Sequence, residues 1–175
     1  VIAVFVVHVV RSMSPEMAVQ RMLAAHYKAM REAIEMPYGL RFRIHLRSML
    51  DRIGLLNTKL VQSEALKQAM NLALIETSAI VDLSRLDELA HRADISQQLK
   101  IHIGELQNLL DDAFRNQEKQ LHLDEEIRAQ VMMKITEIEQ QLQQPNDHDL
   151  QQRLQISLNN IRSSIFHRPT MQAEA

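Results

Sequence analysis

The chain opens with VIAVFVVHVV at residues 1–10, which leads directly into RSMSPE at residues 11–16. A bilayer span needs about 20 apolar residues, and this apolar run is shorter than that. We interpret residues 1–11 as the cytoplasmic end of a transmembrane helix that begins upstream. Because Val and Ile also favour strands, a buried N-terminal strand is the alternative. A strand needs partners, however, and the sequence offers no other convincing strand.

The composition of the 175 residues favours helices. The chain has 3 Gly and 4 Pro, so turns are few and elements are long. Aromatic residues make up only 3%, whereas good helix formers are abundant. Because the chain has no cysteine, disulfides, thiolate zinc sites and thiol nucleophiles are excluded.

Charge is distributed unevenly along the chain. Residues 1–60 hold nine Lys or Arg and four acidic residues, a net charge of +5, whereas the remainder holds 11 and 18, a net charge of -7. Membrane proteins concentrate Lys and Arg on the cytoplasmic side, close to the membrane end of a helix. Arg11 fits this rule directly, and the later arginines fit it if their helices fold back to the lipid surface. The apolar run has no basic residues before it and no cleavage site after it, so it does not resemble a signal peptide.

Six helices are predicted from capping residues, turns and apolar periodicity. Ser14-Pro15-Glu16 is a helix start, because Ser accepts from free N–H groups and Pro suits the first helical position. Within the third helix, Asp82-Leu83-Ser84 is a candidate interruption, because Asp and Ser compete for backbone hydrogen bonds. The last two helices should form an antiparallel hairpin around Pro145-Asn146-Asp147. The first four predicted helices cover about 14–35, 40–56, 63–91 and 94–116, a fifth begins near 124, and a sixth follows the turn and carries Leu150 to Ile165.

Apolar residues recur at helical spacing and predict which face of each helix is buried. The second helix should bury Ile44, Met49, Leu50 and Ile53. The third helix should bury Leu66, Met70, Leu74, Thr77 and Val81. The stripes of the last three helices are Ile95, Leu99, Ile103, Leu106, Leu110 and Phe114; then Ile127, Val131, Ile135, Ile138 and Leu142; then Leu150, Leu154, Leu158, Ile161 and Ile165. The sequence therefore predicts an all-α fold, a multi-helix and mostly antiparallel bundle that follows the end of a transmembrane helix. Residues 1–11 form that membrane end, residues 12–168 the helical cytoplasmic domain, and residues 169–175 a disordered tail.

Motifs of catalysis and cofactor binding are not found. The chain has no Gly-rich phosphate loop and none of the hydrolase, zinc-protease or kinase motifs. Glu88 and His91 have the Glu-x-x-His spacing of di-iron bundles, but such a site needs a second pair and two further Glu residues. His26 lies on an apolar helix face, where a core residue is the simpler interpretation. We therefore expect no catalytic residue, no metal ligand and no cofactor, and we expect the protein not to be an enzyme.

Five arginines are the candidate contact residues. Arg41, Arg43, Arg47 and Arg52 occupy the second helix, and Arg11 follows the apolar run. A solvated helix face is the commonest meaning of such a group. Beside a membrane end, however, contact with anionic lipid headgroups or with a partner is the better functional interpretation. The chain is slightly acidic and has no recognised nucleic-acid motif, so nucleic acid is not an expected partner.

Two short stretches in this order resemble a known family. RSMSPE at residues 11–16 follows the apolar run, and SMLDRIGLL occupies residues 48–56. This order resembles the C-terminal cytoplasmic region of the fusaric acid resistance family, which includes the aromatic acid exporters of bacterial inner membranes. A third stretch, AMNLALI at residues 69–75, departs from the family's usual G-L-N-L, because Ala69-Met70 stands where the Gly would be. The resemblance covers roughly residues 1–115 and transfers no transport residues.

The resemblance implies a function for the protein that contains this chain. It would be an inner-membrane efflux transporter of aromatic carboxylic acids or related toxic compounds, with this segment on the cytoplasmic side supporting assembly or gating. Its partners would be membrane lipid, the rest of its own chain, further copies in a homo-oligomer and a periplasmic adaptor subunit. A soluble helical protein-interaction or signalling module is the alternative. A third hypothesis, a ligand-binding or metal-dependent bundle enzyme, predicts stoichiometric metal and a loss of activity on His91→Ala.

Overall fold

The computed structural model describes residues 14–54, 62–91, 95–120, 124–142 and 148–165. The apolar run, Arg11 and the predicted tail lie outside these residues. No helix in the described part of the chain combines the length and the apolar character that crossing a membrane would require. The described residues form α2 (Pro15–Ile34), α3 (Leu40–Gly54), α4 (Glu64–Ala90), α5 (Gln97–Gln120), α6 (Glu125–Gln141) and α7 (His148–Ile165).

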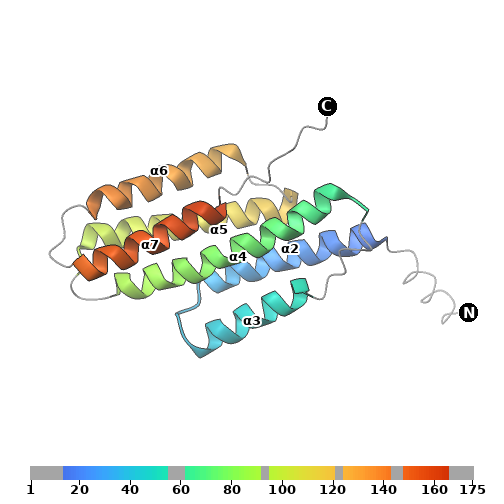
Figure 1. The fold of residues 1–175 in the computed structure, drawn as a ribbon, viewed down its shortest axis with the longest axis horizontal. Coiled ribbons are helices and arrows are strands. Elements are labelled where there is room, and N and C mark those ends of the chain that lie inside the picture. The colour runs from blue at the N-terminus through green and yellow to red at the C-terminus, as the bar shows by residue number, and fades with distance from the viewer. Residues whose placement is uncertain (1–13, 55–61, 92–94, 121–123, 143–147, 166–175) are drawn as a thin grey trace, which may run out of the picture.

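These helices pack as a bundle in which each helix runs antiparallel to the one before it (Figure 1). Helix α7 packs chiefly on α4 and α6 chiefly on α5, which gives a four-helix group of α4 to α7. Helix α2 lies against both α4 and α5. Helix α3 is the outermost helix, because it packs on α2 and only slightly on α4. The prediction of an all-α, mostly antiparallel bundle is confirmed.

Side-chain caps begin the helices close to where the sequence predicts. The Ser14 hydroxyl accepts from the Met17 N–H at the start of α2, and the Ser63 hydroxyl accepts from the Leu66 N–H at the start of α4. Asp124 caps α6 by accepting from the Glu126 N–H. Each cap satisfies one of the N–H groups that a helix start leaves free.

The core is a single apolar cluster that all six helices share. Fully burying one aliphatic side chain contributes about 1.5–3 kcal/mol, which is offset largely by the entropy of ordering the chain. Large side chains that are fully buried include Leu23, Tyr27, Met30, Phe42, Met49, Ile80, Leu83, Leu86, Ile103, Leu106, Leu110 and Phe114.

The predicted interruption at Asp82-Leu83-Ser84 is wrong, because α4 is one continuous helix from Glu64 to Ala90. The Asp82 carboxylate accepts from Arg85 and from Asn160 on α7. Its hydrogen-bonding capacity is therefore used outside its own backbone. Packing against α7 keeps this stretch helical despite its local preference.

Three predicted core residues are exposed instead. Ile44, Leu50 and Leu74 are 61%, 42% and 41% exposed, whereas Phe42, which the predicted stripe omits, is buried at 1%. The reason is that α3 packs along one narrow line on α2, which admits Phe42, Met49 and Ile53. An apolar residue off that line remains in water.

Candidate functional site

A buried polar cluster joins α2, α4 and α5. Tyr27 and His26 come from α2, Glu76 and Thr77 from α4, and Gln117 from α5. All five side chains are at most 3% exposed. Adjacent residues on α2 and on α4 thus bring pairs of polar groups into an otherwise apolar core.

Glu76 is the centre of the larger half of the cluster. Its Oε2 accepts from the Tyr27 hydroxyl at 2.9 Å. The Gln117 amide Nε2 lies 2.8 Å from Glu76 Oε1 and 2.9 Å from Oε2, so both carboxylate oxygens have donors. The remaining polar atom, Gln117 Oε1, is buried and has no partner among the described residues.

His26 and Thr77 form the smaller half. The Thr77 hydroxyl donates to the Ala73 carbonyl at 2.7 Å, so its proton is already used. The His26 Nε2, 2.8 Å from the same hydroxyl oxygen, must therefore be the donor. This fixes the neutral tautomer with the proton on Nε2, and Nδ1 is left buried without a partner in the described part of the chain.

Burial shifts the pKa values of Glu76 and His26 in opposite directions. Desolvation raises the pKa of the Glu76 carboxyl from 4.5 to about 7, although the hydrogen bonds from Gln117 and Tyr27 and the charge of Arg128 lower it. Desolvation lowers the pKa of His26 from 6.5 to about 4, and the charge of Arg52 adds to the effect. The folded interior therefore favours the neutral form of both side chains.

The cluster is suited to holding helices together. Its groups are closed off from solvent, so in this conformation a solute has no access to the Glu76 carboxyl or the His26 ring. The hydrogen bonds of the cluster specify which helices meet, because each buried donor needs its own acceptor, although Gln117 Oε1 and His26 Nδ1 are left without partners among the described residues. We assign the cluster the structural role of setting the register of α2, α4 and α5.

Sequence periodicity finds only part of this cluster. His26 and Thr77 lie on faces that the sequence predicts to be buried. Glu76 and Gln117 are missed because they are polar, and Tyr27 is missed because the predicted buried residue is its neighbour, His26. Glu76 does carry a signal: it lies three residues after Ala73 and four before Ile80, both of which are buried. A polar residue at core spacing is the mark of such a network.

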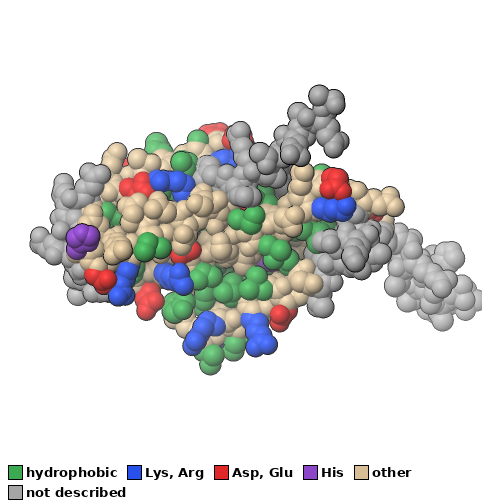
Figure 2. All heavy atoms as spheres, viewed as in Figure 1, with side chains coloured by type: hydrophobic (Ala, Val, Ile, Leu, Met, Phe, Trp, Pro, Cys, Tyr) green, Lys and Arg blue, Asp and Glu red, His purple; other side chains and the backbone are tan. Residues whose placement is uncertain are grey.

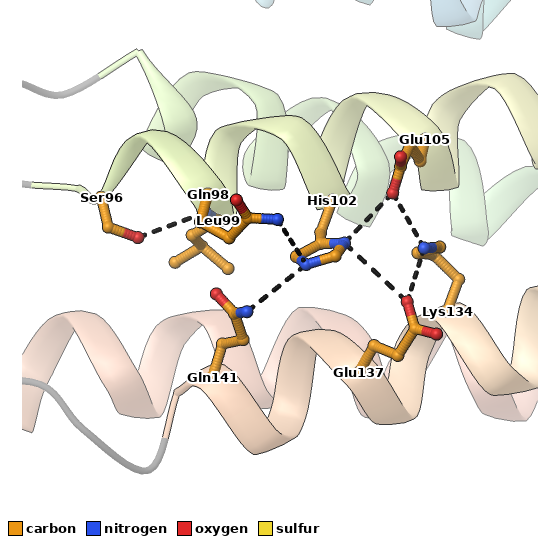
Figure 3. Close-up of polar contacts among 8 residues, drawn as sticks. All are labelled: Ser96, Gln98, Leu99, His102, Glu105, Lys134, Glu137 and Gln141. Carbon is orange, nitrogen blue, oxygen red and sulfur yellow. Dashed lines mark hydrogen bonds and ion pairs between the residues drawn. The ribbon is translucent and has the colours of Figure 1, made fainter.

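A second polar cluster lies at the solvent edge between α5 and α6 (Figure 3). The His102 Nδ1 is 3.1 Å from Glu105 Oε2 and 3.8 Å from Glu137 Oε2. The Lys134 ammonium lies between the same two carboxylates and donates to both of them. On its other side the His102 ring meets Gln98 of its own helix and Gln141 of α6.

This surface cluster has the composition of an ion-pair clamp. His102, Glu105 and Glu137 are metal-ligand types, but the Lys134 ammonium occupies the space that a cation would take between the carboxylates. Across the described residues, no group of three such side chains could hold a metal ion. At the predicted Glu-x-x-His position, His91 instead caps α4 and its Nδ1 lies 2.7 Å from the Asp87 carbonyl.

Four of the predicted contact arginines lie on α3 and belong to neither cluster, although Arg52 is near enough for its charge to lower the pKa of His26. Arg41, Arg43, Arg47 and Arg52 are all exposed, and Arg11 lies outside the described residues. The Arg47 Nε is 4.0 Å from Asp51 Oδ2, and the Arg52 guanidinium donates to the Ser48 hydroxyl at 3.3 Å. The structure therefore places four of the five predicted residues around one exposed helix.

Comparison with known proteins finds no family model, no curated protein and no solved structure that matches the chain.

Proposed function

We propose that this chain is the helical cytoplasmic domain that follows the last membrane helix of an inner-membrane exporter of the fusaric acid resistance type. Its substrates would be aromatic carboxylic acids or related toxic compounds. The observation that carries the proposal is the order of the apolar run, the RSMSPE junction and the MLDRIGLL stretch. The periplasmic adaptor subunit and the homo-oligomer belong to the same proposal.

The positions of the two stretches support it. Ser14 of the junction caps α2, so the regular helix begins at Pro15, four residues after Arg11. In the second stretch, Met49 and Ile53 are buried against the bundle, whereas Asp51 and Arg52 are exposed. Both stretches thus have the character of junction and packing motifs, which suits a domain that supports assembly or gating.

The first test is the location of the natural gene product, expressed with any codons that precede Val1. Recovery in inner-membrane fractions, resistant to high salt and to carbonate, supports the proposal. Recovery in the supernatant would contradict it and favour the alternative, a soluble helical interaction or signalling module. The exposed apolar side chains of α3 make that alternative worth testing.

The second test separates the domain's role from that of the membrane part. Replacing the buried Met49 and Ile53 with Asp should detach α3 from the bundle while leaving the membrane part intact. We expect slower efflux of aromatic acids from cells at equal membrane abundance of the protein. A control variant with Asp at Met133, which is exposed on α6 and lies outside α3, should keep wild-type efflux. Equal efflux in all three proteins would show that the domain supports neither assembly nor gating.

A further inference from the structure

The outer surface of α3 combines exposed apolar and cationic side chains. Leu40 is 67% exposed, Ile44 61% and Leu50 42%, and Tyr38 in the preceding turn is 45% exposed. Figure 2 shows hydrophobic and basic side chains intermixed over α3 at the bottom of the view. We call this set the α3 surface; its members are Tyr38, Leu40, Arg41, Arg43, Ile44, Arg47, Leu50 and Arg52.

The arginines of the α3 surface differ from the other arginines of the bundle in their partners. Within the described residues, Arg41, Arg43 and Arg52 pair with no carboxylate, and Arg47 makes only the 4.0 Å contact with Asp51. On α4 to α7, by contrast, every described arginine pairs with a carboxylate of a nearby residue: Arg85, Arg115, Arg128, Arg153 and Arg162. The positive charge of α3 is thus left for an external anionic partner.

The shape of the α3 surface favours a lipid layer over a protein groove. A single outermost helix is convex, and its apolar side chains are separated by arginines instead of forming one continuous stripe. Along the helix, Leu40 and Ile44 share one line with Arg47 and Asp51, and Arg41 and Arg43 flank that line on either side. Long arginine side chains can reach headgroup phosphates while neighbouring apolar side chains enter the acyl boundary.

We propose that the α3 surface docks on an anionic lipid surface. The proposal rests on the proposed function, which places the domain beside a membrane, and it adds the element and the lipid charge that make the contact. Helix α3 runs back along α2 toward the end at which the chain enters the domain (Figure 1). This direction keeps the arginines beside the helix that follows the predicted membrane junction.

The first experiment measures binding of the full chain to vesicles of phosphatidylcholine with and without phosphatidylglycerol, by co-sedimentation. Each basic residue near an anionic surface is worth roughly fivefold in partitioning. The variant R41Q/R43Q/R47Q should therefore lose roughly 100-fold of the affinity for the anionic vesicles. Residues 1–10 are present in every protein compared, so any partitioning that they cause cancels.

A matched variant controls for net charge. K67Q/R115Q/R153Q removes the same number of positive charges from α4, α5 and α7, where each side chain pairs with a carboxylate of its own helix. It should bind anionic vesicles within about twofold of the wild type, since its charges are already neutralised locally. Equal losses in the two variants, or no loss in the α3 variant, would overturn the proposal.

The second experiment locates the contact and works even if the affinities are hard to compare. Because the chain has no cysteine, one nitroxide can be attached at Ile44→Cys and, as a control, at Met133→Cys on α6. The two positions are similarly exposed, at 61% and 58%. The electron paramagnetic resonance signal reports how often each label collides with oxygen, which is enriched in lipid, or with a water-soluble nickel complex. On anionic vesicles, the label at position 44 should become more accessible to oxygen and less accessible to the nickel complex, with no change at position 133.

Three results would contradict the proposal in distinct ways. Unchanged accessibility at position 44 on vesicles that do bind the protein would place the contact elsewhere. Binding to soluble polyglutamate without binding to vesicles would assign the α3 surface to an acidic protein partner. Failure of the wild-type chain to bind anionic vesicles, while the natural protein still fractionates with membranes and exports aromatic acids, would overturn this inference alone and leave the proposed function standing.

Discussion

Two glutamates that each have two hydrogen-bonding partners lie in opposite environments. Glu76, in the core, accepts from Tyr27 and Gln117, and Glu105, at the surface, accepts from Lys134 and lies beside His102. In the core, the loss of hydration outweighs the hydrogen bonds and raises the pKa of Glu76 to about 7. At the surface, the hydrogen bonds from Lys134 and His102 lower the pKa of Glu105 because hydration is retained. Burial, more than the number of donors, decides which form of a carboxyl group the fold favours.

The largest expected difference between the two sites is the loss of unfolding free energy when each glutamate is replaced by alanine. Glu76→Ala removes a buried side chain and leaves the Tyr27 and Gln117 donors without acceptors, so the free energy of unfolding should fall by about 3 kcal/mol. Urea denaturation at about pH 5.5, where the folded state holds Glu76 mostly protonated, measures it. Glu105→Ala should leave the urea midpoint nearly unchanged. Similar losses in both variants would mean that burial does not distinguish the sites.

The pH dependence of stability tests the comparison through proton uptake. The pKa of Glu76 is raised from 4.5 to about 7, so its contribution to stability is present below pH 4.5 and is lost as the pH rises through 7. The pKa of His26 is lowered from 6.5 to about 4, so its contribution is present above pH 6.5 and is lost as the pH falls through 4. Between pH 4.5 and 6.5 the two slopes therefore oppose each other.

Single substitutions should reveal each slope. Relative to the wild type, Glu76→Gln should gain about 3 kcal/mol of unfolding free energy as the pH rises from 4.5 to above 7. His26→Leu should show the opposite trend, gaining relative to the wild type as the pH falls from 6.5 to 4. Urea midpoints across this range measure both, and the double variant should show neither trend. Parallel pH curves for all four proteins would contradict the assigned shifts.

Removing one hydroxyl gives the next smaller effect. Tyr27→Phe keeps the ring that packs against Phe114, but it removes one of the two donors to Glu76. We expect a loss of about 1–2 kcal/mol in unfolding free energy, the cost of a buried acceptor left short of a donor. Tyr38→Phe at the exposed turn is the matched control and should change thermal stability little. A loss of the same size at position 38 would mean that the effect does not depend on the buried hydrogen bond to Glu76.

The smallest effect is expected at the surface cluster. Lys134→Met removes the donor that bridges Glu105 and Glu137. Because this cluster lies at the solvent edge, the loss should be measurable at low ionic strength and vanish in about 0.5 M NaCl. Thermal unfolding at the two salt concentrations measures it. A loss that persists in high salt would mean that the clamp between α5 and α6 acts through packing and not through charge.

Helix existence and boundaries could be predicted because they depend on local chemistry. The predicted capping residues Ser14, Ser63 and Asp124 each lie one residue before a helix in the structure. They could be predicted because a cap satisfies N–H groups only a few residues away. The apolar stripes of α5 to α7 could also be predicted. Ile103, Leu110, Val131, Leu154 and the other predicted residues of those helices are buried or partly buried. Both helices that frame the surface cluster were predicted in this way.

The partner of each helix could not be predicted from the sequence. The prediction of a hairpin of the last two helices suggests that each is the other's main neighbour, but α7 packs chiefly on α4 and α6 on α5. Ile44 and Leu50 lie at plausible core spacing and are nevertheless exposed. Which side of a helix becomes the line of contact depends on the shape of its neighbour, and that neighbour can be distant in sequence.

By itself, the sequence determined the all-α class, the places where helices begin and the concentration of arginine on residues 41–52, because caps, periodicity and charge act over a few residues. Only the tertiary structure decided that Tyr27, Glu76 and Gln117 meet in the core, and that Arg41, Arg43 and Arg52 of α3 have no carboxylate partner among the described residues. These groups are separated by up to 90 residues along the chain. Their pKa values and partners depend on burial and distance, which exist only once the helices have packed.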